Sequence, residues 1–224
     1  MMETKIEIRK RLLEQRNALS TEEVNEKSSA LFERLCALKE YGNAKIVLAY
    51  MDYRNEIMTV EFIKRCMRNG KRVALPKVEV KNVMASSVSD KVLLVPDVAL
   101  SVSDKVSLVP EYTLSVYEIN EVERDTIPGF KGIPEPDSAG LNKLDPKEID
   151  LAVIPGVAFD YDRHRVGYGA GFYDRFLPML RPDCIKAGVA YSFQLVDKIP
   201  SGRYDMPMDI IVTDDENIKI IRSR

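Results

Sequence analysis

The sequence predicts an α/β protein of three layers, with a mainly parallel sheet covered by helices on both faces. Short apolar runs of strand length alternate along the chain with longer segments that favour helix. Glycine or proline stands where several of these segments should end, as at Gly70, Pro76 and Pro155. Such alternation is typical of strand–helix–strand units, whose helices pack on both faces of the sheet.

Four segments are predicted to be helical. The first is rich in Glu, Lys, Arg and Leu. The second opens on Ser20-Thr21-Glu22-Glu23, which has the form of a capping box. Gly70 would end the third, and the fourth follows a glycine-rich stretch. The predicted helices span residues 4–18, 20–40, 59–69 and 172–180.

Apolar runs between the helices predict buried strands. Pro76 would end the second of them, and Pro155-Gly156 breaks the chain after the third. Ligands of such sheets bind outside the carboxyl ends of the strands, so a site is expected after the third strand. The predicted strands span residues 45–50, 71–75, 150–154, 185–191 and 209–213, with residues 218–221 as an added edge.

A tandem repeat interrupts this pattern. Residues 87–100 and 101–114 are identical at ten of 14 positions, and Ser115-Val116 begins a truncated third copy. Alternating valines with serine, aspartate and proline breaks predict short β-segments, and two copies are too few for a solenoid. We expect one domain over residues 1–224, with a β excursion inserted at about 84–120.

Composition argues against several classes of function. The net charge of −2 gives no basic field that would attract nucleic acid. No apolar run approaches the roughly 20 residues that cross a bilayer, and the first residues lack the apolar region of a signal peptide. The three cysteines are far apart, without the spacing of a zinc site, and suit a reducing cytoplasm. His164 is the one histidine, so triad chemistry would depend on it alone.

The stretch from Arg165 to Asp174 carries the strongest chemical signal, because Gly167, Gly169 and Gly171 alternate within it. Glycine permits positive φ and lets a ligand approach backbone N–H groups, and such groups bind phosphate. Arg165 adds a guanidinium that matches phosphate oxygens. Asp174 adds a carboxylate that can hold magnesium. A plain glycine-rich turn is the alternative, but the flanking arginine and aspartate favour phosphate.

The match extends beyond this loop. Residues 155–160 read Pro-Gly-Val-Ala-Phe-Asp, and together with residues 165–174 they resemble the signature of the 5-formyltetrahydrofolate cyclo-ligase family. The departures are Val166 for leucine and Phe172 for tyrosine, with Ala170 at a variable position. Weaker blocks also fit in family order. These are Lys5-x-x-x-Arg9, Asn55-Glu56-Ile57 and Ile133-Pro134-Glu135-Pro136, whereas the interval from about 83 to 120 has no counterpart.

The resemblance implies an ATP site on the first helix and the glycine stretch. From periodicity alone, Lys5, Arg9 and Arg16 form a basic stripe on one helix face, which would be solvated. The resemblance instead implies that Lys5 and Arg9 contact ATP phosphates, and it gives no such support to Arg16. The implied ATP-binding residues are Lys5, Arg9, Arg165, Val166, Gly167, Tyr168, Gly169, Ala170, Gly171, Phe172 and Tyr173.

The resemblance also implies a folate site and a magnesium site. Glu56 would accept hydrogen bonds from the pterin ring, as a carboxylate can, and Arg165 and Tyr168 would be catalytic. Asp174 and Asp205 would hold Mg²⁺, although Asp209, four residues after Asp205, is an alternative ligand. The implied folate-binding residues are Met51, Glu56, Tyr168, Gly169, Ala170, Gly171 and Phe172.

The expected protein is therefore a cytoplasmic enzyme that takes a folate and ATP with Mg²⁺, as a monomer or weak homo-oligomer, without nucleic-acid or membrane partners. A phosphosugar isomerase or CoA-transferase relative is the alternative enzyme, and it would need a catalytic carboxylate but no ATP. A non-catalytic nucleotide-binding module is the alternative of another class. Because none of the assigned residues lies in residues 101–114, we expect that deleting this copy leaves most activity intact.

Overall fold

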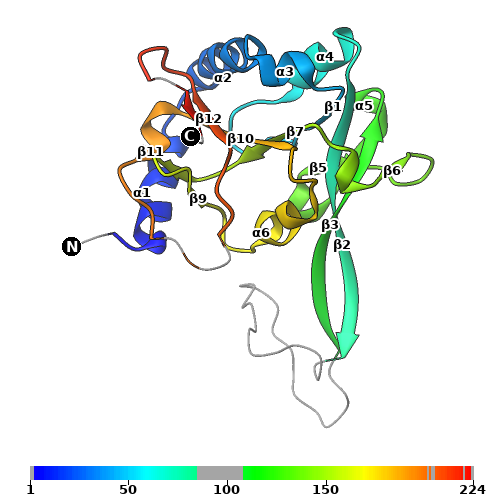
Figure 1. Ribbon diagram of the computed structural model, residues 1–224. Coiled ribbons are helices and arrows are strands. Elements are labelled where there is room, and N and C mark those ends of the chain that lie inside the picture. Colours follow the sequence, from blue (N-terminus) through cyan, green and yellow to red (C-terminus); the bar gives the residue numbers. More distant parts are fainter. Residues whose placement is uncertain (1–2, 85–107, 201, 203–204, 219, 223–224) are drawn as a thin grey trace.

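A computed structural model describes residues 3–84, 108–200, 202, 205–218 and 220–222. An eight-stranded sheet forms its centre (Figure 1). Five neighbouring strands, from β12 to β2, run parallel, and the strands beyond them on both edges are antiparallel. The predicted mainly parallel sheet is confirmed. In spatial order the strands are β13 (Ile221–Arg222), β12 (Ile210–Thr213), β10 (Ile185–Ala190), β7 (Leu151–Pro155), β1 (Ile46–Leu48), β2 (Arg72–Met84), β3 (Leu108–Ile119) and β6 (Lys143–Leu144).

Helices cover both faces of this sheet. Alternate residues of β7 show the two sides, because Leu151 and Val153 pack with one buried cluster, and Ala152 and Ile154 with the other. The first cluster lies under α2 (Thr21–Cys36), α3 (Lys39–Asn43) and α4 (Val60–Arg68), and the second under α6 (Phe172–Phe176) and the 3₁₀ turn η4 (Leu177–Met179). Figure 1 shows these groups above and below the sheet, as the three-layer prediction requires.

A small three-stranded sheet lies beside the second layer. It consists of β11 (Leu195–Val196), β8 (Ala158–Asp160) and β9 (Arg165–Val166). Helix α1 (Lys5–Asn17) packs its Ile8 and Leu12 against this sheet. The remaining elements are α5 (Val122–Asp125), β4 (Thr126–Pro128), η2 (Phe130–Gly132), β5 (Pro134–Pro136), η3 (Pro146–Glu148) and η5 (Ser192–Gln194).

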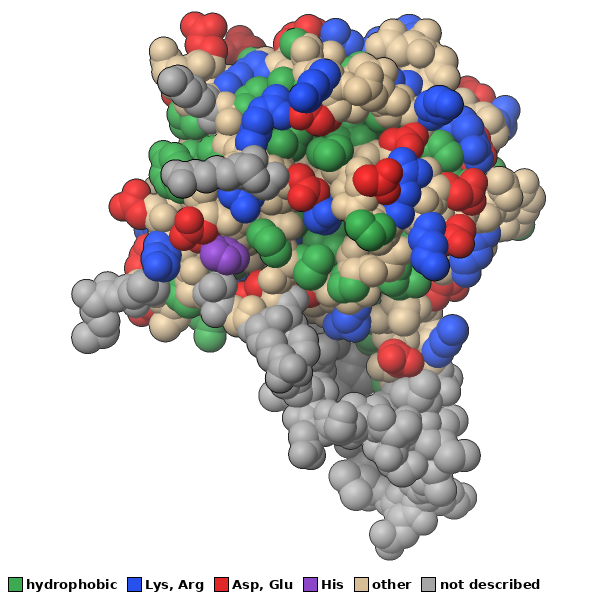
Figure 2. Space-filling model, in the orientation of Figure 1, with side chains coloured by type: hydrophobic (Ala, Val, Ile, Leu, Met, Phe, Trp, Pro, Cys, Tyr) green, Lys and Arg blue, Asp and Glu red, His purple; other side chains and the backbone are tan. Residues whose placement is uncertain are grey.

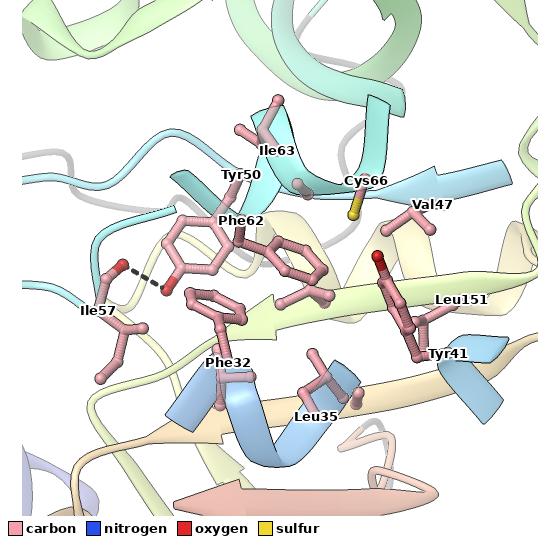
Figure 3. Packing of buried hydrophobic residues seen from close by; sticks show 14 of the residues in the cluster. Phe32, Leu35, Tyr41, Val47, Tyr50, Ile57, Phe62, Ile63, Cys66 and Leu151 are labelled. Atoms are coloured by element: carbon pink, nitrogen blue, oxygen red, sulfur yellow. Dashed lines mark hydrogen bonds between the residues drawn. The ribbon is translucent and has the colours of Figure 1, made fainter. Parts of the chain in front are cut away.

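The larger core cluster fixes the turn that follows β1. Figure 3 shows Phe32 of α2 stacked on Phe62 of α4, with ring centroids 4.2 Å apart. Beside them the hydroxyl of buried Tyr50 donates to the carbonyl of Ile57 at 3.0 Å. The backbone just after Glu56 is thereby held to the core through the carbonyl of Ile57. This contact fixes the position of Glu56 relative to the sheet.

The helix starts were predicted better than the helix ends. Both amino-terminal helices begin with a capping box, formed by Ser20 and Glu23 at α2 and by Thr4 and Glu7 at α1. The predicted end of the second helix near residue 40 is wrong, because Leu38 has an extended backbone and α3 starts anew. The predicted helix 172–180 ends at residue 176. Pro178 follows in a 3₁₀ turn, since proline cannot continue α-helical hydrogen bonding.

Strand β2 does not end at Pro76, as the sequence had suggested, but continues to Met84. Its pairing with β1 stops at Ala74, and among the described residues no other strand pairs with that edge of β2, so a proline is tolerated there. The continued strand pairs with β3 in a long antiparallel ribbon that projects from the body (Figure 1). The ribbon thus begins before the expected excursion at about 84–120. Most of the repeat lies in residues 85–107, outside the described residues.

The visible surface carries charges of both signs. On the face in Figure 2, basic and acidic side chains are interspersed rather than gathered by sign. Charged side chains of opposite sign also form ion pairs among the described residues, as Arg72 does with Glu118 at 2.7 Å. In the part of the chain that the structure describes, no helix combines the length and apolar character that crossing a bilayer requires.

Candidate functional site

One cavity of about 420 Å³ gathers every residue that the sequence assigned to a site. This volume is within the range of ligand pockets in proteins. The assigned residues come from four distant parts of the chain, which the fold brings together. They are Lys5, Arg9, Met51, Glu56, Arg165, Val166, Gly167, Tyr168, Gly169, Ala170, Gly171, Phe172, Tyr173, Asp174 and Asp205.

The cavity lies at the carboxyl ends of parallel strands. Tyr50 and Met51 follow β1, and Pro155 ends β7. This is the edge where ligands of such sheets bind. One detail differs from the expectation. The glycine loop does not follow β7 directly, because β8 and β9 form a hairpin in between and place Arg165 on its second strand.

The three glycines of the loop have different physical reasons. Gly169 and Gly171 have φ angles of 107° and 66°, which side chains rarely tolerate. Gly167 instead leaves space, because a Cβ there would lie 2.7 Å from Nη1 of Arg165. The alternation therefore serves two left-handed backbone positions and one close approach of a guanidinium. The sequence had predicted positive φ angles and the close approach of a ligand, and the structure confirms the positive φ angles at Gly169 and Gly171.

Helix α1 supplies two cations to the cavity. Arg9 donates its Nε hydrogen to the carbonyl of Gly167 at 2.9 Å, which ties the helix to the loop. Lys5 donates to Asp205 Oδ2 at 2.5 Å. Burial opposes ionisation of Asp205, but the hydrogen bonds from Lys5 and the Gly202 N–H outweigh it and lower the pKa of this carboxyl. Arg9 and Lys5 thus both lie beside hydrogen-bond acceptors. They do so in the cavity where the sequence predicts that phosphate and magnesium bind.

Arg165 and Asp174 form an ion pair at the two ends of the loop. The guanidinium donates to Asp174 Oδ1 at 2.8 Å, lies over the Tyr173 ring at 5.5 Å and is 8% exposed. Its Nε is buried and has no hydrogen-bond partner among the described atoms. Arg165 also lines the cavity, so the N–H groups of its guanidinium can donate to an anionic ligand there.

Two carboxylates on one cavity fit a magnesium ion, because Mg²⁺ prefers oxygen ligands and keeps waters and phosphates in its shell. Asp174 and Asp205 both line the cavity. Asp209, the alternative ligand, does not line it, since its Oδ2 accepts from the backbone N–H of Lys186 at 2.8 Å and from the Nζ of Lys186 at 2.7 Å. The geometry favours Asp205 as the second carboxylate.

Two aspartates and a histidine cluster near the glycine loop, and hydrogen bonds within the protein explain this cluster. Asp160, Asp162 and His164 bring their ligand atoms within 4.8 Å of one another. However, Asp160 already accepts from the His164 N–H at 2.8 Å and from the Ile199 N–H at 2.9 Å. Asp160 therefore orders the turn between β8 and β9.

Glu56 is a nearly buried carboxylate, 6% exposed, at the inner end of the cavity. It accepts from the Tyr53 N–H at 2.9 Å and from the Tyr168 hydroxyl, and it lies 3.6 Å from Arg16. Burial raises the pKa of Glu56, although the charge of Arg16 and these hydrogen bonds act in the opposite direction. Such a group offers strong acceptors to a ligand that presents N–H donors.

Sequence reasoning missed a set of apolar residues in the lining of the cavity. They come from the β2–β3 ribbon and from the turn between β4 and β5. The residues of the β4–β5 turn could have been found from the sequence, because the Ile-Pro-Glu-Pro block resembles the family. That resemblance, however, suggested no role for them. The missed apolar residues are Pro76, Val78, Leu114, Phe130, Ile133 and Pro134.

The second repeat copy also supports the glycine loop. Tyr112 of β3 packs edge-on against Phe172 of the loop and against Phe130, with centroids 6.2 and 5.5 Å away. Its carbonyl accepts from Arg175, which also donates to the Ala170 carbonyl. Residues 101–114 hold none of the assigned site residues, but they contribute Leu114 to the cavity lining and Tyr112 to the support of the loop.

The repeat offers a matched pair of deletions that test this support. Removing residues 87–100 keeps Tyr112, whereas removing 101–114 leaves a chain of equal length with Val98 at that position. We expect the first variant to keep most activity. The second should show a several-fold higher KM for a substrate bound by the loop, since each aromatic pair contributes about 1 kcal/mol. Steady-state kinetics of both, beside Tyr112→Val, would check this, and equal kinetics in the two deletions would contradict it.

Comparison with known proteins agrees with this geometry. The sequence matches the 5-formyltetrahydrofolate cyclo-ligase family over residues 1–214. The chain belongs to this family. A 5-formyltetrahydrofolate cyclo-ligase of Mycoplasma pneumoniae is 28% identical over 210 residues, covering 93% of this chain and 97% of the relative. A probable cyclo-ligase of Caenorhabditis elegans is 27% identical, covering 96% and 95%.

Solved structures of the cyclo-ligase family share the fold. The NMR structure of 5,10-methenyltetrahydrofolate synthetase from Aquifex aeolicus superposes with a TM-score of 0.74 at 29% identity, covering 97% of this chain and 92% of that one. The synthetase from Mycoplasma pneumoniae gives a TM-score of 0.64 at 25% identity, covering 94% and 99%. The similarity thus extends over nearly the whole chain.

Proposed function

We propose that this cyclo-ligase family member converts 5-formyltetrahydrofolate to 5,10-methenyltetrahydrofolate, using ATP and releasing ADP and phosphate. The observation that supports this most is the gathering of Lys5, Arg9, Arg165, Glu56 and two carboxylates around one cavity. The family name gives the reaction, and the cavity provides cations for phosphates and a buried acceptor for a pterin.

The chemistry follows from the substrate. The formyl group on N5 is an amide, and its oxygen is a poor leaving group. Transfer of the γ-phosphoryl group to that oxygen gives a phosphorylated intermediate and ADP. N10 then attacks the activated carbon and loses its proton to solvent, and the C–O bond breaks as phosphate leaves. Phosphoryl transfer requires mainly positioning and neutralisation of charge. Lys5, Arg9, Arg165 and the N–H groups of the loop are suited to both tasks.

Magnesium, when bound by Asp174 and Asp205, would neutralise phosphate charge and align the transferring group. In the structure each carboxylate is paired with a cation, Arg165 or Lys5. If the metal replaces these partners, the two cations become free to face the phosphates. The residues present therefore fit a site in which Asp174 and Asp205 would hold the metal. Arg165 and Lys5 would then pair with the phosphates of a nucleotide instead of with these carboxylates.

An assay of folate turnover tests the proposed function. The methenyl product absorbs in the near ultraviolet and the formyl substrate does not, so product formation can be followed directly. We expect turnover that requires both ATP and Mg²⁺. Product formation at the same rate without ATP, or no turnover of 5-formyltetrahydrofolate by the folded protein, would contradict the proposal.

Glu56→Gln tests the folate half of the site. The amide keeps one acceptor but brings an N–H donor toward the pterin donors, and a mismatched buried donor costs about 1–3 kcal/mol. We expect the KM for 5-formyltetrahydrofolate to rise about tenfold or more, while ATP affinity measured without folate changes little. Glu14→Gln is the control, because Glu14 is exposed on α1 and does not line the cavity. A selective loss of ATP binding would remove Glu56 from the folate pocket.

A further inference from the structure

Two residues that line the 420 Å³ cavity, Glu56 and Tyr168, contact a buried cation of α1. Arg16, in the last turn of α1, is 1% exposed, although the stripe that it shares with Lys5 and Arg9 was expected to be solvated. Burial of a guanidinium is costly unless it is paired. Its Nε is buried and has no hydrogen-bond partner among the described atoms. A cation retained in this position needs a reason beyond helix formation.

The partners of Arg16 both belong to the proposed folate site. Its Nη1 lies 3.6 Å from Glu56 Oε1, and its guanidinium lies over the Tyr168 ring at 5.3 Å. Tyr168 in turn donates its hydroxyl to Glu56. Three segments far apart in sequence, namely α1, the turn after β1 and the glycine loop, therefore meet at one cation.

Arg16 does not line the 420 Å³ cavity. It lines a small space of about 10 Å³ together with Gln194 and Gly156, and Glu56 lines both this space and the large cavity. A ligand in the large cavity meets Glu56 and Tyr168, and both of these contact Arg16. Arg16 can therefore act on that ligand through these two side chains.

We propose that Arg16 is a positioning residue for the folate, which keeps the Glu56 carboxylate ionised and directed at the pterin and holds Tyr168 beside it. This inference rests on the proposed function, since it takes the pterin as the ligand of Glu56. The groups that face Glu56 are Arg16, Tyr168, Tyr50, Tyr173 and Asp52, and of these Arg16 carries the positive charge.

Removal of this charge has a defined pH signature. Burial raises the pKa of Glu56, and Arg16 limits the rise. Without Arg16 the pKa should be higher still, so the carboxylate is lost at a higher pH as the solution is acidified. The acid limb of kcat/KM for the folate should then move to higher pH, which a purely structural role of Arg16 would not produce.

The experiment compares Arg16→Met, which has similar length without charge, with Arg16→Lys. Arg11→Met is the matched control, because Arg11 lies on the same helix and pairs with Glu3 at the surface. For Arg16→Met we expect a roughly tenfold higher KM for 5-formyltetrahydrofolate at neutral pH, a KM for ATP within about threefold of wild type, and a displaced acid limb. Arg16→Lys should keep the wild-type acid limb, and Arg11→Met should change none of these quantities.

A double variant separates the possible outcomes. In a Glu56→Gln background, Arg16→Met should add little to the folate KM, because the two changes remove one coupled interaction. An acid limb that stays in place, one displaced equally by Arg16→Lys, or additive effects in the double variant would overturn the positioning role. If Arg16→Met does not fold, Arg16→Gln, which also removes the charge but keeps a polar head, takes its place in both comparisons, and an unmoved acid limb in that variant would overturn the positioning role. Failure of the wild-type protein to turn over folate would instead overturn the proposed function.

Discussion

Asp174→Asn should lower turnover by at least about a hundredfold, which corresponds to roughly 3 kcal/mol of lost transition-state stabilisation. The amide keeps the size of the side chain but removes the charge that a magnesium ion requires. It also leaves Arg165, 8% exposed, without its carboxylate partner. Turnover should be measured across a magnesium titration, and the defect should be greatest at limiting magnesium.

Asp183→Asn is a suitable control for this substitution. Asp183 also pairs with an arginine, Arg181, at 2.9 Å, but it is exposed and does not line the cavity. Loss of an exposed aspartate–arginine pair should cost less than about 1 kcal/mol of stability and leave turnover unchanged. A purified, folded Asp174→Asn protein that works near the wild-type rate at limiting magnesium would remove Asp174 from the metal site.

The sequence predicted those parts of the fold that depend on local chemistry. Capping boxes at Thr4 and Ser20 start the first two helices because their side chains satisfy free backbone N–H groups nearby. The apolar runs became parallel strands because burial on both faces requires such composition. Element ends were less predictable. Strand β2 can continue through Pro76 because its neighbour β1 pairs with it only as far as Ala74. That pairing depends on the tertiary structure and cannot be read from the local sequence.

The site residues were predictable where a motif carried them. The glycine stretch, Glu56 and the Lys5–Arg9 pair all lie on one cavity. Arg16 was missed because a helical stripe of cations resembles a solvated face, and only the packed structure reveals that its carboxyl-terminal end is buried. Leu114 and Tyr112 were missed because they lie in a repeat that no motif connects to the loop.

Arg165→Ala should weaken ATP binding or slow phosphoryl transfer by about 2–4 kcal/mol, or roughly 30- to 1000-fold, since it removes a charge-assisted donor pair. The structure adds a second reason. The guanidinium packs over Tyr173 and beneath Gly167, so its loss also leaves a gap under the loop. Arg165→Lys should recover only part of the activity, because an ammonium cannot reproduce the planar fork.

The control for Arg165→Ala must be an arginine without structural contacts. Arg181 fails this condition, because it donates to Asp150 and also pairs with Asp183. Arg68, exposed at the end of α4, is the better choice, and Arg68→Ala should leave the kinetics unchanged. Both variants should be compared by melting temperature, ATP binding without folate, and turnover. Equal kinetics in two folded variants would reject a special role for Arg165, whereas a defect confined to Arg165→Ala in ATP binding or transfer would place its guanidinium on the phosphates.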